Sequence, residues 1–267
     1  MNILLPTDFS ENATLAAEFA FDLAQKGRGT VHVLNAYDLP YSDRSMTTAL
    51  LEVMKENAEK NMEAFEKKLR SFGTDYTTEI LLGNPIRLIK EKARDKNIDL
   101  VVMGTKGASG LEEVLIGSNA ASVIHNVTKP VLIVPPKAKL KAVEKMIFAT
   151  DFELENDRPA LQQLRQFAQL YEAKIDVVHV QKNEGSRSGS RQLVEEVLHN
   201  LPHEYTILHN HNIEEAVTQE AEKENADMIV SIAHRYGFFE GLFHRSISSK
   251  LAYHTHLPLL VLTEPKK

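Results

Sequence analysis

The 267-residue chain contains no cysteine, no tryptophan and only 12 glycines. Its apolar runs all stay well short of the ~20 residues that a membrane-spanning helix requires. The absence of cysteine excludes disulfides and thiolate metal sites, and it suits a reducing cytoplasm. The net charge of −6 argues against a protein that binds nucleic acid through a basic face. The opening MNILLPTDFS lacks the charged start and long apolar region of a secretory signal. We therefore expect a cytoplasmic protein that binds neither nucleic acid nor membrane.

Short apolar runs alternate with segments of helical periodicity along the chain. Uninterrupted runs of this kind are typical of parallel strands covered on both faces by crossover helices. The first half contains ILLP, TVHVLNA, TTEILLG, DLVVMGT and PVLIVPP, and the second contains MIFAT, KIDVVHV, YTILHN, DMIVSIA and PLLVLTE. After the first run, alanines and larger apolar residues recur at helical spacing from Ala13 to Ala24, with Ser10 as the candidate N-cap. The pattern predicts doubly wound α/β layers.

The two sets of five runs align with each other, so the chain is predicted to hold two copies of one domain. Thr7-Asp8-Phe9 matches Thr150-Asp151-Phe152 at an offset of 143, and Asn35 matches His179 at an offset of 144. The fourth and fifth runs match at 128, and we place the change of 16 between the second and third strands. There the first half carries extra residues with one long predicted helix, whose apolar positions are Leu51, Met54, Ala58, Met62, Phe65 and Leu69. The second half has KNEGSRSGSR instead, typical of a loop.

A Pro- and Lys-rich segment around 136–144 is the predicted linker. The expected domains are therefore 1–138 and 144–267, each a five-stranded parallel sheet.

Glycine is concentrated in GTKGASGLEEVLIGS, which follows the fourth apolar run of the first half. Such sheets bind ligands beyond the C-terminal strand ends, where the strand order reverses. Glycines there allow close backbone approach, and a following helix N-terminus favours phosphate. Gly104, Gly107, Gly117 and Ser118 are separated by two, nine and no residues. Neither the Rossmann nor the Walker glycine pattern is present. An ordinary strand-to-helix turn is the alternative.

This glycine spacing, together with PTDFSE after the first strand, resembles the nucleotide-binding branch of the universal stress protein family. The resemblance covers the whole chain as a tandem pair of domains. It implies a Rossmann-like fold of the adenine nucleotide alpha hydrolase-like kind, with the two domains paired about a pseudo-twofold axis through their last strands. It also implies a stress-response role, with a further protein partner and a second copy of the chain as candidates for association.

Carried over by position, the resemblance assigns an adenine nucleotide site to the first domain. It implies that Pro6, Thr7 and Asp8 border the base and ribose, that Ala36 presents backbone groups to the adenine edge, and that Met103 walls the pocket. Ribose and phosphates are assigned to Gly104, Gly107, Gly117, Ser118 and Asn119. Lys106 can reach a phosphate, although a solvated loop lysine is the equal alternative. Asp8 can instead cap the following helix. The expected ligand is ATP or AMP, with any Mg²⁺ held on phosphate oxygens.

The second half departs from this pattern. At an offset of 128, Ile232, Arg235 and Arg245 stand opposite the three glycines, and only Ser246 keeps its counterpart. We expect no ATP binding of the family kind there. The alternatives are a structural partner domain or a site for a different ligand, built from His234, Phe238, Phe239, Phe243 and Arg245. Nine of the eleven histidines lie from His179 onward. The pairs His209/His211 and His254/His256 raise zinc binding, but they lack a third ligand at fixed spacing.

Three functions remain open. The first is an adenine-nucleotide-binding regulatory protein, whose nucleotide shifts a conformational or partner equilibrium. The second is a slow ATPase; near the glycine motif the sequence shows no arginine cluster and no evident base beyond Asp8, so efficient phosphoryl transfer is not expected. The third is a nucleotide-free structural adaptor.

Overall fold

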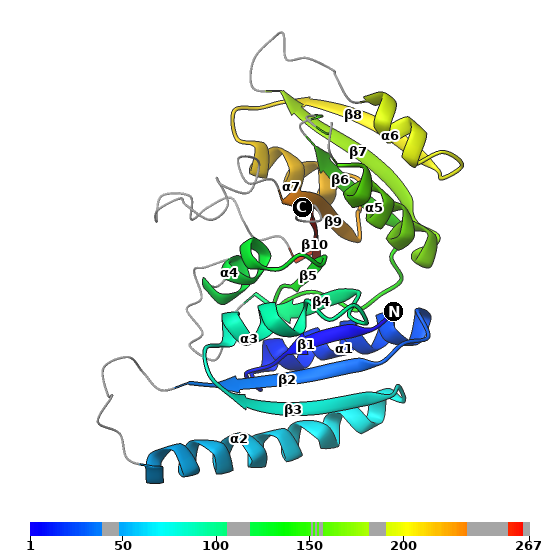
Figure 1. The fold of residues 1–267 in the computed structure, drawn as a ribbon. Helices are drawn as coiled ribbons and strands as arrows, with labels where there is room; N and C mark the ends of the chain where they lie inside the picture. Colours follow the sequence, from blue (N-terminus) through cyan, green and yellow to red (C-terminus); the bar gives the residue numbers. More distant parts are fainter. Residues whose placement is uncertain are drawn as a thin grey trace. The chain divides into compact units, whose positions relative to one another are not determined.

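The structure is a computed structural model of the full chain. It describes residues 1–38, 48–105, 118–150, 152, 154, 157–181, 191–233 and 256–263. The chain divides into two compact units, Met1–Pro136 and Lys137–Lys267. Each is an α/β unit with a five-stranded parallel sheet, which confirms the predicted fold class (Figure 1). The expected domain limits at 138 and 144, and the pairing of the units through their last strands, stay predictions.

The first unit alternates strands and helices along its whole length. Its elements are β1 (Ile3–Pro6), α1 (Glu11–Lys26), β2 (Val31–Tyr37), α2 (Thr48–Leu69), the 3-10 turn η1 (Arg70–Phe72), β3 (Tyr76–Leu82), α3 (Pro85–Lys92), β4 (Leu100–Gly104), α4 (Ser118–Asn126) and β5 (Val131–Val134). The strands lie in the order β3-β2-β1-β4-β5. The order therefore reverses between β1 and β4, where this fold places its ligands.

The helices of the first unit cover both faces of its sheet. α1 packs on β1, β4 and β5 and touches η1, whereas α3 packs against α4. Since parallel crossovers are right-handed, the outward path β1-β2-β3 and the return path β3-β4-β5 carry their helices on opposite faces. α1 is amphipathic because alanines and larger apolar residues recur at helical spacing, and its buried residues are Asn12, Ala13, Ala16, Ala17, Phe19, Ala20, Phe21, Leu23 and Ala24. The long helix predicted in the insertion is α2.

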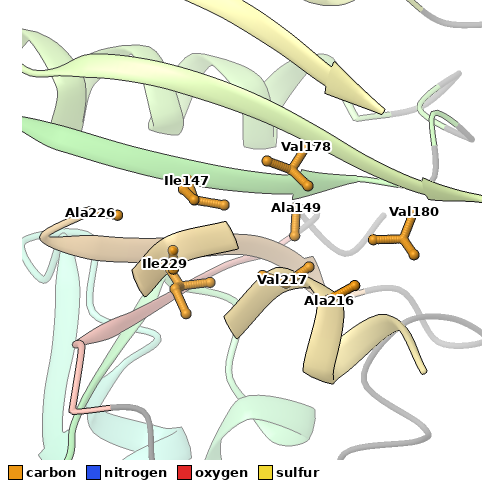
Figure 2. Packing of buried hydrophobic residues seen from close by; sticks show 9 residues of the cluster. Ile147, Ala149, Val178, Val180, Ala216, Val217, Ala226 and Ile229 are labelled. Atoms are coloured by element: carbon orange, nitrogen blue, oxygen red, sulfur yellow. The ribbon is translucent and has the colours of Figure 1, made fainter. Parts of the chain in front are cut away.

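The second unit repeats this plan. Its elements are β6 (Lys145–Thr150), α5 (Arg158–Tyr171), β7 (Lys174–Gln181), α6 (Arg191–Val197), β8 (His203–His209), α7 (Ile213–Lys223), β9 (Met228–Ala233) and β10 (Leu259–Thr263). Its strand order, β10-β9-β6-β7-β8, matches that of the first unit. One core cluster lies where α7 packs on β6 and β7, and it also includes Ile229 of β9; Figure 2 shows Val217 of α7 beside Ala149 of β6. Such burial contributes about 25 cal/mol per Å² of apolar surface.

The strand registers agree with the predicted repeat and refine it. Ile3 pairs with Leu100 as Met146 pairs with Met228, which gives offsets of 143 and 128. Between the second and third strands, however, the offset falls from 144 to 127, because β2 pairs Val31 with Tyr76 whereas β7 pairs Ile175 with His203. The predicted change of 16 at that point was therefore wrong by one residue, since the observed change is 17. The offset then rises by one, from 127 to 128, between the third and fourth strands. Strand three shows only a weak apolar pattern, so the sequence alone did not fix its alignment.

Across the residues that the structure describes, no helix combines the length and the apolar character that a membrane crossing would need.

Candidate functional site

The candidate site lies at the C-terminal ends of β1, β2 and β4, three adjacent strands of the first unit. Pro6 ends β1, Ala36 lies near the end of β2, and Met103 and Gly104 end β4. The β1–β4 pairing aligns Leu4 with Val101, so Pro6 and Met103 lie two residues further along neighbouring strands. The structure thus brings the residues predicted to border a base together with the first glycine of the predicted phosphate segment.

The turn after β1 is held by local hydrogen bonds. Thr7 is buried, its N–H donates to the Leu34 carbonyl at 2.9 Å, and its hydroxyl accepts from the Phe9 N–H at 3.0 Å. Phe9 has φ = 63°, a left-handed conformation that needs such local support. The turn brings Ser10 to the N-cap of α1, where its hydroxyl accepts from the Ala13 N–H at 3.1 Å. The predicted N-cap is confirmed.

Asp8 is the exposed carboxylate at this edge of the sheet. Its Oδ1 accepts from the Ser10 N–H at 3.1 Å, which fixes the carboxylate beside the helix start. Ser10 is the N-cap residue, and the Asp8 carboxylate lies at the positive end of α1, as the capping alternative expects; this position is compatible with a ligand contact. Because an ionised carboxylate offers about four acceptor positions, the exposed Asp8 is a candidate acceptor for a ligand donor.

Asn35 anchors the same turn from β2. It is buried, and its Nδ2 donates to the Thr7 carbonyl at 2.8 Å. Ala36, the next residue, is only half-buried. The sequence analysis predicts no structural role for Asn35. A polar residue late in an otherwise apolar strand is the sequence signal that could have indicated its hydrogen bond to the turn.

Gly104 is where it was predicted, but its surroundings give a different reason for the glycine. A Cβ there would lie 2.6 Å from Oδ1 of Asn12 and 3.2 Å from the Asn12 carbonyl oxygen, both in α1. The side-chain space at Gly104 is thus taken by the protein itself. Close approach of a helix is thus a reason for this glycine that the sequence did not show, and close approach of a ligand stays a prediction.

The structure describes only part of the rest of the predicted phosphate segment. Lys106, Gly107 and Gly117 lie outside the described residues. Ser118 and Asn119 belong to the first turn of α4, and Asn119 is exposed. Helix N-termini of this kind present free N–H groups that favour anions.

The second unit keeps the turn but not the strand end. Phe152 has φ = 62°, its N–H donates to the Thr150 hydroxyl at 3.0 Å, and His179 Nδ1 lies 2.9 Å from the Thr150 carbonyl, where Asn35 stands in the first unit. Ile232 lies in β9 with a buried side chain, at the position that aligns with Gly104 of the first unit. Asp151 and the residues of the alternative site, His234, Phe238, Phe239, Phe243, Arg235, Arg245 and Ser246, lie outside the described residues.

The structure also describes only some of the paired histidines. His209, His211 and His256 are exposed, and His254 is outside the described residues. Within the described ranges, no three His, Asp or Glu side chains converge as a metal site would require.

Known proteins resemble this chain in sequence over parts of its length and in fold over nearly all of it. A model of the universal stress protein family matches residues 1–135 and 190–263. Two universal stress proteins of Methanocaldococcus jannaschii are 34% identical over 141 residues and 31% identical over 153 residues; each alignment spans 51% of this chain, and they span 83% and 94% of the relatives. The crystal structure of a universal stress protein from Archaeoglobus fulgidus, 23% identical, covers 98% of both chains with a TM-score of 0.77, so the two chains share a fold.

Proposed function

The chain belongs to the universal stress protein family. We propose that its first unit binds an adenine nucleotide, ATP or AMP, and that this chain is a stress-response regulatory protein controlled by that nucleotide. The observation that carries the proposal is the meeting of Pro6–Asp8 with Met103 and Gly104 at the point where the strand order reverses. Ligands of doubly wound sheets bind at such reversals.

The proposed contacts divide between the two strand ends. Pro6, Thr7 and Asp8 border the base and ribose, with backbone groups of Ala36 at the adenine edge and Met103 as an apolar wall. Ribose and phosphates are held by Gly104, Gly107, Gly117, Ser118 and Asn119, with Lys106 as a point charge. The exposed carboxylate of Asp8 and the N-terminal turn of α4 support this division, because one can accept from hydroxyl or amino groups and the other favours anions. Magnesium, when bound, sits on the phosphate oxygens.

The second unit is proposed not to bind ATP in this way. Its strand β9 carries Ile232 where β4 carries Gly104, and Arg235 and Arg245 replace the other two glycines. Side chains at the positions of Arg235 and Arg245 would keep a phosphate farther from the backbone N–H groups than glycines do. We expect one nucleotide per chain.

The first experiment asks whether the purified chain holds a nucleotide. Acid extraction followed by chromatography should recover one adenine nucleotide per chain, or the emptied protein should take up one in calorimetry. A chain that is empty and does not take up ATP or AMP would favour the nucleotide-free adaptor. Multiple-turnover phosphate release at about 1–1000 per second would instead make the protein an ATPase.

A matched pair of variants tests the location. Gly117→Val should abolish ATP binding, because it places a branched side chain in the proposed phosphate space. Arg245→Val changes the aligned position of the second unit and should leave ATP affinity unchanged. If Gly117→Val binds ATP like the parent protein, the glycine motif is not the phosphate site.

A further inference from the structure

Asn12 joins three elements at the C-terminal edge of the first sheet. It lies in the first turn of α1 and is 8% exposed. Its Nδ2 donates to the carbonyl of Val134, the last residue of β5, at 3.0 Å. Its Oδ1 is 3.4 Å from the hydroxyl of Thr105, which directly follows β4. The direction of the amide is fixed, because the carbonyl of Val134 can only accept.

Asn12 lies closer to β4 than a Cβ atom at position 104 would allow. Oδ1 of Asn12 stands 2.6 Å from the point where a Cβ at position 104 would lie. A glycine is therefore required at the end of β4 for the amide to reach between β4 and β5. The Val134 carbonyl also accepts from the Thr105 N–H at 3.2 Å, so one buried oxygen ties both the strand end and the helix start. Such a satisfied polar cluster favours a single geometry.

The second unit has the same strand register without this contact. β9 pairs Ile232 with Leu262 as β4 pairs Gly104 with Val134. Ile232 has a side chain where Asn12 needs none, and α5 starts eight residues after Thr150, whereas α1 starts four residues after Thr7. The asparagine–glycine contact is thus found in the unit that carries the glycine motif, and the sheet itself does not need it.

We propose that Asn12 is a positioning residue of the nucleotide site: it sets the separation between the turn after β1 and the start of the phosphate segment after β4. This inference rests on the proposed nucleotide binding in the first unit. Asn12 lies in α1, directly after the turn that contains Thr7–Ser10, and its side chain packs against Gly104 and Thr105. It therefore connects the two groups of proposed contacts. A ligand that spans both groups depends on this separation, whereas a ligand that uses only the first group does not.

The test compares ATP with adenosine in calorimetry. Removing the amide with Asn12→Ala should weaken ATP binding about fivefold or more, as expected for lost hydrogen bonds that hold a site in place. Adenosine lacks phosphates, so its affinity should change less than about twofold. A general loss of stability would not change the ratio of the two affinities. The control is Asp99→Ala, which removes a bond to the Asn2 N–H at the opposite end of β4 and should leave that ratio unchanged.

A second pair of variants tests the contact itself. Gly104→Ala alone puts a methyl group against Asn12 Oδ1 and should weaken ATP binding. The double variant Asn12→Ala/Gly104→Ala should bind ATP more tightly than Gly104→Ala, because the methyl then enters the vacated space. If Asn12→Ala does not fold, Asn12→Ser and the double variant decide the question.

Each outcome is decisive. An unchanged ATP-to-adenosine ratio in Asn12→Ala or Asn12→Ser, or no recovery in the double variant, overturns the role of Asn12 while nucleotide binding stands. A parent protein that binds neither ligand overturns both proposals. A selective loss of ATP affinity with recovery in the double variant supports the role of Asn12.

Discussion

Asp227 precedes β9 and ties its start to the start of β6. Its Oδ2 accepts from the N–H groups of Glu144 at 2.8 Å and Lys145 at 3.0 Å, and its carboxylate pairs with Lys141. The side chain is only 9% exposed. Replacing it by alanine leaves two strand-leading N–H groups without their acceptor, so we expect a clear loss of stability in the second unit.

The first unit supplies the internal standard. Asp99 occupies the aligned position before β4 but accepts one backbone bond, from the Asn2 N–H at 2.8 Å. A hydrogen bond to a charged group contributes about 1.5–3 kcal/mol, so Asp99→Ala should cost about 2 kcal/mol and Asp227→Ala about 4 kcal/mol. The pair with Lys141 adds little, since the lysine is half-exposed.

The difference should also depend on pH. Burial would raise the pKa of Asp227, but hydrogen bonds from Lys141 and from the backbone of Lys145 and Glu144 outweigh it and lower that pKa. A carboxyl whose pKa is lowered in the folded state stabilises the protein above its unfolded pKa of about 3.9, and this stability is lost as the pH falls through the folded value. The stability difference between the parent protein and Asp227→Ala should therefore narrow as the pH falls below about 4.

Urea unfolding followed by circular dichroism measures the overall loss, and peptide-level hydrogen exchange assigns it to β6 and β9 or to β1 and β4. Equal losses in the two variants would refute the reasoning, because Asp227 is buried and accepts two backbone bonds, whereas Asp99 is exposed and accepts one. A stability difference between the parent protein and Asp227→Ala that does not narrow at all as the pH falls below about 4 would refute the electrostatic part.

Two further predictions concern buried side chains. Asp176, 1% exposed in β7, has a raised pKa because of burial and the nearby charges of Glu204, Glu220 and Glu224, opposed by a bond from Thr206; Asp176→Asn should therefore be more stable than the parent protein at pH 7 in urea unfolding, and the gain should vanish below about pH 4, where the carboxyl is neutral in both states. No gain at pH 7 would mean that the charge is well accommodated. Phe65 of α2 is 3% exposed and packs edge-on against Phe9, with ring centroids 5.8 Å apart; Phe65→Ala should cost about 3–5 kcal/mol. Val53→Ala on the same helix, at a side chain 49% exposed, should stay within about 0.5 kcal/mol, and similar losses from both would contradict the packing of α2.

Much of the fold followed from the sequence because buried parallel strands need long apolar runs, and each of the ten predicted runs overlaps a strand. The third strand was aligned one residue out because edge strands bury little; β3 has no fully buried residue. Pro6 and Gly104 lie at strand ends as expected, because both close apolar runs that could be recognised as strands, whereas their role in a site stays a prediction. Asn12 was missed because a polar residue in the first turn of a helix is usually solvated, and only contacts across 93 residues of sequence reveal that it is buried.

The two copies of the strand frame superpose in register at β4/β5 and β9/β10, although the residues that follow them have diverged. Segment 104–118 and segment 232–246 are therefore interchangeable in length, which makes the chain a natural host for transplanting one strand-end segment onto the other copy. The sequence carries Glu155 at the position that aligns with Asn12 at an offset of 143, so a recipient of the glycine segment would need the start of α1 as well as the glycines.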